Sequence, residues 1–126
     1  MPKKRILIVD DEPLVCESLR MALACDRHQT VIAKSGLEAL AKLDAQTFDL
    51  VFTDYLMPGM KGDQLAHAIK ERDQTKPIVL LTGVPPAEHL LEIDLVMLKP
   101  FSLESLRRAI TQVMEPEPVE TCCPAP

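Results

Sequence analysis

The chain has 126 residues, with 19 acidic against 14 basic side chains and a formal net charge of −5 at pH 7. This length favours a single domain, and the acidic balance gives no electrostatic support for a nucleic-acid partner. Apolar residues make up 47% and charged residues 26%, which excludes a disordered chain, and no apolar run reaches the roughly 18–20 residues of a membrane span. The start MPKK leads into a strand-length run rather than a signal peptide. We therefore expect a cytoplasmic protein with no membrane partner.

Short apolar runs alternate with amphipathic segments along the chain. We predict strands over Arg5–Asp10, Thr30–Ala33, Leu50–Thr53, Pro77–Thr82 and Leu95–Leu98. Between and after these strands we predict helices over Pro13–Cys25, from Ser35 through Leu43, over Gly62–Arg72 and after Ser102. Several strands are continuously apolar and rich in Val, Ile and Leu, which is typical of parallel strands covered on both faces.

Two of the helix starts carry capping signals, and one helix is weakly predicted. Ser35 and Glu38 match a capping box, and Ser102 is a good N-cap for the last helix. The connection Gly83–Asp94 is short and contains two prolines, so we expect at most one or two helical turns over Ala87–Glu92.

Alternating strands and helices predict an α/β domain over residues 1–114. The expected architecture is a single doubly wound sheet of five parallel strands with helices on both faces. Residues 115–126 (EPEPVETCCPAP) have no helical period and are interpreted as a flexible, proline-rich C-terminal tail. In such sheets, ligands bind outside the carboxyl ends of the strands.

The cysteines and histidines show no metal-ligand spacing. The cysteines are Cys16, Cys25, Cys122 and Cys123, and the histidines are His28, His67 and His89. Because no CxxC pair is present, we interpret the cysteines as reduced thiols rather than zinc ligands. The histidines are interpreted as surface or partly buried polar groups.

Acidic, hydroxyl and ammonium groups occupy successive strand ends. The first strand ends at Asp10-Asp11, the third at Asp54, the fourth at Thr82 and the fifth at Lys99. A single aspartate at a strand end is usually a cap or a turn residue. Three carboxylates at one sheet edge repel one another unless a cation such as Mg²⁺, or Mn²⁺, shares the site. Such a cluster with a hydroxyl and a lysine is suited to phosphoryl transfer.

Four motifs in register resemble one known family. They are ILIVDDEP (Ile6–Pro13), FTDYLMPGMKG (Phe52–Gly62), LLTG (Leu80–Gly83) and LKPF (Leu98–Phe101). With these motifs, residues 4–114 resemble a receiver domain of a bacterial two-component response regulator. The resemblance implies a flavodoxin-like fold with strand order 2-1-3-4-5.

The resemblance also implies a phosphorylation site. Asp54 would accept a phosphoryl group from a histidine kinase or a histidine phosphotransfer protein. Asp11 and Asp54 would ligate Mg²⁺ together with the backbone carbonyl of Leu56, and Asp10 would act through water. The domain would then signal to a downstream protein through its fourth helix, fifth strand and fifth helix, without turning over an external substrate as an enzyme does.

The remaining site residues follow from the same resemblance. Lys99 would pair with phosphoryl oxygens, Thr82 would hydrogen-bond the phosphorylated state, and the Lys99-Pro100 peptide bond would be cis. Gly83, directly after Thr82, leaves room for a phosphoryl group to approach.

The chain departs from the family pattern at three places. The Thr82–Lys99 interval is shorter than usual, and Val96 stands where a switch Tyr or Phe is common. We therefore expect phosphorylation to order or shift Val84–Asp94. Leu56 and Val84 cannot hydrogen-bond a hydrolytic water, so a long-lived acyl phosphate is expected, unless both side chains serve only in packing.

Two other functions fit parts of the pattern. A haloacid-dehalogenase-type phosphatase also combines a nucleophilic Asp, a hydroxyl, a Lys and Mg²⁺, but its nucleophile ends the first strand in a DxD arrangement. A pseudo-receiver that binds partners without phosphorylation would fit the missing aromatic at Val96. The intact acidic, hydroxyl and lysine positions favour the phosphoacceptor over both alternatives.

Overall fold

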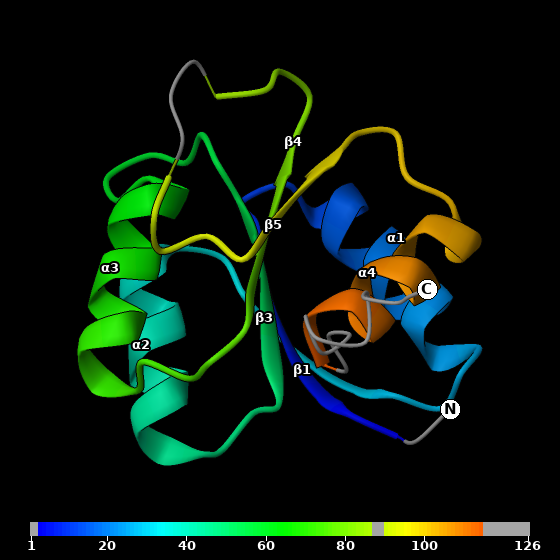
Figure 1. Ribbon diagram of the computed structural model, residues 1–126, viewed down its shortest axis with the longest axis horizontal. Coiled ribbons are helices and arrows are strands. Elements are labelled where there is room, and N and C mark those ends of the chain that lie inside the picture. The colour runs from blue at the N-terminus through cyan, green and yellow to red at the C-terminus, as the bar shows by residue number, and fades with distance from the viewer. Residues whose placement is uncertain (1–2, 87–89, 115–126) are drawn as a thin grey trace, which may run out of the picture.

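The computed structural model describes residues 3–86 and 90–114 and places all the predicted strands in one sheet (Figure 1). The strands are β1 (Arg5–Val9), β2 (Gln29–Ala33), β3 (Leu50–Asp54), β4 (Ile78–Thr82) and β5 (Leu95–Leu98). Their order is β2-β1-β3-β4-β5, and every neighbouring pair is parallel. The predicted fold class and strand order are therefore confirmed, and each strand end differs from its predicted position by at most one residue.

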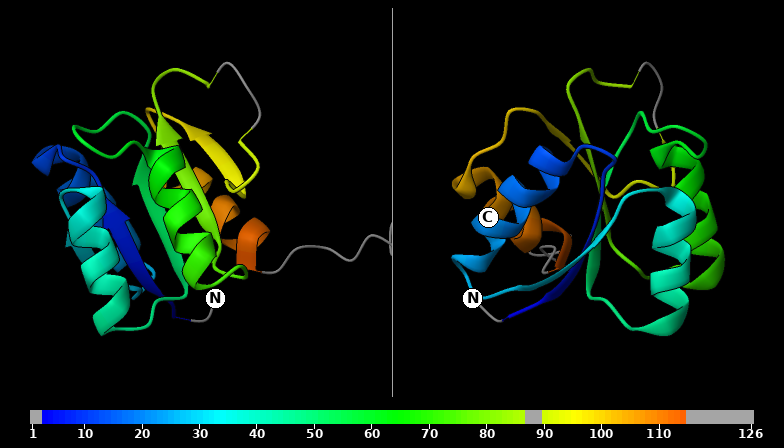
Figure 2. Two further views of the ribbon diagram at one scale, coloured as in Figure 1. Left: turned by 90° about the vertical axis from the view of Figure 1, so that its left-hand side faces the viewer. Right: turned by 180° about the vertical axis from the view of Figure 1, so that it is seen from behind.

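Helices cover both faces of the sheet. They are α1 (Pro13–Ala24), α2 (Gly36–Ala45), α3 (Gly62–Arg72) and α4 (Leu103–Met114). Figures 1 and 2 show α1 and α4 on one face and α2 and α3 on the other. Within the part of the chain that the structure describes, none of the helices has the length and apolarity that a bilayer crossing requires.

Strand alternation divides the core into two halves. Because successive side chains of a strand point to opposite faces, Ile6 and Ile8 of β1 pack towards α1 and α4, whereas Leu7 and Val9 pack towards α2 and α3. All four side chains are almost completely buried. Burial on both faces explains why the sequence of this strand is continuously apolar.

Serine side chains cap two helices at the predicted positions. The Ser35 hydroxyl accepts a hydrogen bond from the backbone N–H of Glu38, and the Ser102 hydroxyl accepts one from that of Ser105. The Glu38 carboxylate, however, accepts from the backbone N–H of Lys34 rather than that of Ser35. The predicted capping box is thus formed with its return bond displaced by one residue, and it still fixes the start of α2.

The connection between β4 and β5 tests one expectation in part. Residues 90–92 of the expected helix over Ala87–Glu92 form a turn and irregular backbone, and residues 87–89 lie outside the described part of the chain. The last helix of the fold therefore carries the label α4. The predicted tail, residues 115–126, also lies outside the described residues, as do His89, Cys122 and Cys123.

The described cysteines match their interpretation, and one histidine does not. Cys16 and Cys25 are free thiols, the first buried and the second exposed. His28 is buried, against the expectation of a surface or partly buried group. Its Nδ1 accepts the backbone N–H of Lys4 at 2.9 Å, which offsets part of the cost of removing the ring from water. Burial lowers the pKa of His28 below its ordinary value.

Candidate functional site

Three carboxylates meet at the carboxyl edge of the sheet. Val9 of β1 lies opposite Thr53 of β3 in the parallel register, so the two strands end side by side. Asp10 and Asp11 follow β1, and Asp54 is the last residue of β3. Carboxylate oxygens of all three residues lie within 4.8 Å of one another. Within residues 3–86 and 90–114, this is the one acidic or histidine cluster with the spacing of a metal site.

Asp10 is the buried member of this cluster, with 1% of its surface exposed. Its Oδ1 accepts the backbone N–H of Glu12 at 2.9 Å. Burial raises the pKa of the Asp10 carboxyl above its usual range; the Glu12 N–H opposes this rise, the charge of Asp54 adds to it, and Lys99 opposes it. A positive charge at this position therefore relieves an unfavourable local concentration of negative charge.

Lys99 brings a positive charge to this acidic cluster. Its Nζ lies 3.4 Å from Oδ2 of Asp10 and 3.3 Å from Oδ1 of Asp54. The backbone N–H of Lys99 donates to the carbonyl of Thr82 at 2.8 Å, and the following peptide bond, to Pro100, is cis. The ends of β1, β3, β4 and β5 are thus joined by direct contacts at one place.

Asp54 continues into a closed loop that leads to α3. Its Oδ1 accepts the backbone N–H of Tyr55 at 2.9 Å, and the Tyr55 carbonyl accepts the backbone N–H of Gly62 at 2.8 Å. Leu56 lies on this loop with 62% of its surface exposed. A Cβ on Gly62 would come within 2.3 Å of the Asp54 carbonyl oxygen, so glycine is required for this close approach.

The end of β4 brings a hydroxyl to the same edge. Thr82 is buried, and its Oγ1 donates to the Val84 carbonyl at 2.8 Å and accepts the Val84 backbone N–H at 3.2 Å. A Cβ on Gly83 would have no neighbouring atom within 4 Å, so the space beside Thr82 is open. Val84 is 69% exposed. Leu56 and Val84 therefore do not serve as packing residues, and the alternative that they do so is wrong.

The chemistry of the cluster fits a divalent cation. Three carboxylates at mutual ligand distance offer only oxygen donors, and such donors favour a hard ion such as Mg²⁺. Asp11 is exposed and Asp54 is partly exposed, so water molecules can complete the coordination of an ion that the carboxylates hold on one side.

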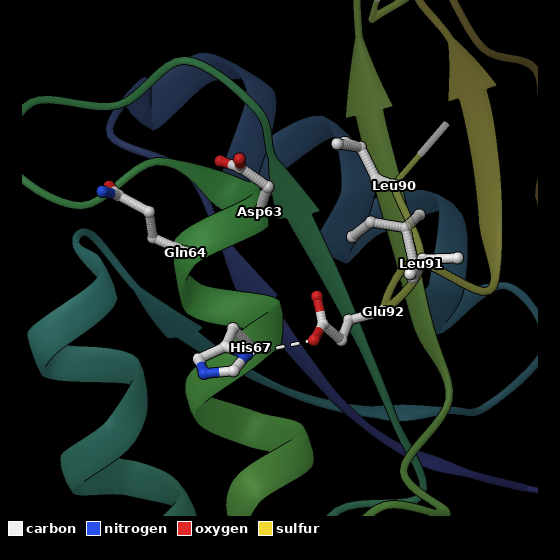
Figure 3. Close-up of a pocket in the computed structure, with 7 residues that line it drawn as sticks. Asp63, Gln64, His67, Leu90, Leu91 and Glu92 are labelled. Carbon is white, nitrogen blue, oxygen red and sulfur yellow. Dashed lines mark hydrogen bonds and ion pairs between the residues drawn. The ribbon is translucent and has the colours of Figure 1, made fainter. Parts of the chain in front are cut away.

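A second set of contacts ties α3 to the connection before β5, and the sequence analysis did not find it. Nδ1 of His67 lies 3.0 Å from Oε2 of Glu92, as Figure 3 shows. These residues line a pocket of about 410 Å³, together with Asp63, Gln64, Leu90, Leu91 and Ile93. His67 and Glu92 lie in different elements with no shared motif, so no local sequence signal could pair them.

The position of the expected switch aromatic also lies near this connection. Val96, in β5, is 39% exposed and lies opposite Leu80 of β4. Valine is short and β-branched, so its χ1 rotation is restricted. It cannot move a large group between a buried and an exposed position as a tyrosine or phenylalanine ring can.

Comparison of the chain with known proteins identifies its family. The model of the response regulator receiver domain matches residues 6–111. The chain is 33% identical over 119 residues to the sensor histidine kinase TmoS of Ectopseudomonas mendocina, covering 87% of this chain and 12% of TmoS. It is 30% identical over 115 residues to the regulatory protein VanRB of Enterococcus faecalis, covering 87% of this chain and 52% of VanRB. The chain thus spans about half or less of these curated relatives.

Solved structures show the same similarity in three dimensions. The chemotaxis protein CheY4 of Vibrio cholerae superimposes with a TM-score of 0.83 at 27% identity, covering 89% of this chain and 99% of that one. The response regulator TrrA of Thermotoga maritima, solved in complex with Mg²⁺-BeF, gives 0.82 at 32% identity, covering 87% and 98%. Since the family model spans nearly all of the described fold, the chain belongs to the response regulator receiver domain family.

Proposed function

We propose that this receiver domain accepts a phosphoryl group on Asp54 from a histidine kinase or histidine phosphotransfer protein and passes the change to a downstream protein. The observation that supports the proposal most strongly is the contact of Lys99 Nζ with Asp54 at 3.3 Å and Asp10 at 3.4 Å, beside the exposed Asp11. Nucleophile, cation ligands and ammonium group are thereby held at one edge of the sheet.

The transfer requires an attacking carboxylate and a phosphohistidine donor. An oxygen of Asp54 forms a bond to phosphorus as the P–N bond of the donor breaks, and the electron pair stays on the imidazole, which takes a proton from solvent. The product is an acyl phosphate. The charge spreads over the three equatorial oxygens during transfer, so positioned positive charge accelerates the reaction.

The residues at the strand ends divide this work. Asp11 and Asp54, with the Leu56 carbonyl and with Asp10 through water, would hold Mg²⁺ or Mn²⁺, and the ion when bound supplies charge neutralisation for the phosphoryl oxygens. Lys99 would exchange a carboxylate oxygen for a phosphoryl oxygen. Its backbone bond to Thr82 keeps the ammonium group directed at the site during this exchange.

Thr82 would link the site to the connection after β4. Its hydroxyl donates to the Val84 carbonyl, and it has a single proton to donate. A new hydrogen bond from Thr82 to a phosphoryl oxygen therefore breaks its bond to Val84. We propose that this exchange orders or shifts residues 84–94 and presents β5 and its neighbouring helix to the partner. Hydrogen exchange tests this step: unchanged protection across the segment on phosphorylation would contradict it.

The domain would be a phosphoprotein rather than an enzyme acting on external substrates. It catalyses its own phosphorylation and a slow loss of the phosphoryl group. Sustained phosphate release from a generic phosphomonoester would instead support a small phosphatase.

Labelling by a small phosphodonor tests the proposed function. Wild type and Asp54→Asn are incubated with acetyl phosphate and Mg²⁺, and acid-stable, base-labile phosphate is measured. We expect label on the wild type and none on Asp54→Asn. Asp44→Asn is the matched control, because Asp44 is an exposed aspartate in the last turn of α2 that pairs with Arg72 at the end of α3, and it is expected to label normally.

Two results would contradict the proposal. Equal label on wild type and Asp54→Asn would place the phosphoryl group elsewhere, and an unlabelled wild type would favour a pseudo-receiver.

A further inference from the structure

We propose that Gly36, at the start of α2, is a positioning residue for the divalent-cation site, because it lets Met60 hold the loop between β3 and α3 in place. This inference rests on the proposed function. It concerns a residue outside the acidic cluster and outside the motifs that resemble the family.

The distances between α2 and the loop leave no room for a side chain on Gly36. A Cβ there would lie 2.6 Å from Sδ, 2.9 Å from Cβ and 3.0 Å from Cγ of Met60. The sulfur belongs to a flexible side-chain end, but the Cβ of Met60 is attached directly to the backbone. A side chain at residue 36 therefore displaces the backbone of Met60 as well as its side chain.

The start of α2 cannot retreat to absorb the clash. Only Lys34 and Ser35 separate Gly36 from β2, and the strand ends at Ala33, which is completely buried and paired with Val9. The Ser35 hydroxyl accepts from the Glu38 backbone N–H and fixes the first turn of the helix. The displacement therefore falls on the loop that carries Met60.

A displacement at Met60 reaches the acidic cluster through a short chain of hydrogen bonds. The backbone N–H of Met60 donates to the Pro58 carbonyl at 3.1 Å, and the loop is closed by the Gly62 N–H on the Tyr55 carbonyl at 2.8 Å. The Tyr55 N–H in turn donates to Oδ1 of Asp54 at 2.9 Å. A movement of Met60 therefore changes the position of the Asp54 carboxylate. It also moves the carbonyl of Leu56, which lies in the chain between Asp54 and Met60.

Helix propensity alone predicts the opposite effect of an alanine. Alanine in place of glycine within a helix normally stabilises a protein by restricting its unfolded chain. A loss of cation affinity in Gly36→Ala would therefore report the contact with Met60 and not the helix itself. This opposition of signs makes the substitution informative.

The chain provides its own reporter for cation binding. It has a single tyrosine and no tryptophan, so Tyr55, directly after Asp54, accounts for the long-wavelength protein fluorescence. Titration of the full-length protein with MgCl₂ while this emission is followed gives the dissociation constant without any phosphodonor.

The decisive measurement compares Gly36→Ala, Met60→Ala and the double variant. We expect Gly36→Ala to weaken Mg²⁺ binding roughly tenfold, the low end of what loss of an outer-shell partner costs a metal site. Met60→Ala removes Sδ and Cγ of Met60 and leaves only its Cβ, at 2.9 Å, against a side chain at residue 36. The double variant is therefore expected to recover most of the lost affinity and to come within about threefold of Met60→Ala alone. Leu37→Ala is the matched control, since Leu37 is an exposed residue of the same helical turn, and it should bind Mg²⁺ like the wild type.

Every other outcome either supports or overturns the inference. Unchanged affinity in folded Gly36→Ala, or a loss that Met60→Ala does not restore, would overturn it while leaving the proposed function intact. If Gly36→Ala fails to fold, a double variant that folds and binds Mg²⁺ supports the contact, and a double variant that also fails to fold rejects it. A wild type that does not bind Mg²⁺ would remove the proposed function and this inference together.

Discussion

The two faces of β5 differ in how they are covered. On the α4 side, Met97 is buried and Leu95 packs against the core shared with α1 and α4. On the opposite side, Val96 and Leu98 are 39% and 50% exposed. The difference arises because α4 follows β5 directly and folds back over one face, whereas the connection before β5 has no helix in its described residues, 83–86 and 90–94.

This difference separates two parts of the molecule. The covered half is the sheet where helices α1–α4 pack against it, and it stabilises the fold; the uncovered half is the exposed face of β5 with the connection before it, residues 83–86 and 90–94, and it is free to change. The covered half carries large, fully buried side chains, and their burial is the main source of folding free energy. The uncovered half holds apolar side chains beside a few exposed ion pairs, which contribute little stability and can rearrange at small cost. A signal that must alter contacts without unfolding the domain is best placed in the uncovered half.

Truncation of a leucine in each half tests the comparison most directly. Leu106 of α4 is completely buried, and we expect Leu106→Ala to lower the free energy of unfolding by about 3 kcal/mol. Leu98→Ala, on the uncovered face, should lower it by less than about 1 kcal/mol. Urea denaturation of both variants measures the difference. Equal losses would mean that the face of β5 beside α3 is covered in solution.

Addition of Mg²⁺ is expected to stabilise the domain through the acidic cluster. A ligand that binds only the folded state at a hundred times its dissociation constant adds about 2.7 kcal/mol to the free energy of unfolding. The measurement is thermal or urea unfolding with MgCl₂ and with EDTA. Asp11→Asn should remove most of the gain, whereas Asp94→Asn, beside α3, should keep it. A gain that survives in Asp11→Asn would point to a different cation site.

The sequence predicted the covered half well because local signals determine it. Continuous apolar runs such as Ile6–Val9 report burial on both faces, and strand ends can be located from the first charged residue. Parallel topology then brings Asp10, Asp54 and Lys99 to one edge without any knowledge of side-chain contacts. Convergence of these three residues was therefore predictable from strand order alone.

Side-chain contacts between elements could not be predicted in the same way, whether in the uncovered half or elsewhere. The His67–Glu92 contact joins residues 25 positions apart, and the clash that excludes a side chain at Gly36 depends on the packing of Met60. Neither contact leaves a periodic pattern in the sequence. The burial of His28 was missed for the same reason, since the donor to its Nδ1 is the backbone N–H of Lys4, and every residue type except proline offers that donor.

The lifetime of the proposed acyl phosphate tests the role of the two apolar side chains beside the site, Leu56 and Val84. Leu56 and Val84 are both exposed beside the cluster, and neither can orient a water molecule for attack. We expect the double variant Leu56→Asn/Val84→Gln to lose its phosphoryl group about tenfold faster, equal to about 1.4 kcal/mol in the barrier. The decay of labelled protein after removal of the phosphodonor is measured. Met21→Gln, which makes an exposed apolar residue of α1 polar outside the site and outside residues 84–94, is the control and should decay at the wild-type rate.

Titration of His28 gives a smaller effect in the covered part of the molecule. Burial lowers the pKa of its ring in the folded state below the ordinary 6.5. The unfolded chain therefore binds more protons once the pH falls below 6.5, so the stability contribution is complete above that value and is lost as the pH decreases. Urea unfolding from pH 8 to pH 5 should show this loss. In His28→Asn, which keeps an acceptor for the Lys4 N–H, the slope should be reduced.

The smallest expected effect has the opposite sign and belongs to the uncovered half. The hydrogen bond to Glu92 and the charges of Glu71 and Glu92 raise the pKa of His67 above 6.5. Its contribution is therefore complete below pH 6.5 and is lost as the pH rises through the folded-state pKa, and it is weak because the ring is exposed. NMR titration of the His67 ring measures the value directly. Glu92→Gln should lower this pKa towards 6.5, and more strongly than Glu71→Gln, because Glu92 makes the shorter contact, at 3.0 Å against 3.4 Å. A wild-type ring that titrates at 6.5, with a pKa that neither substitution changes, would mean that residues 90–94 are not held to α3 before phosphorylation.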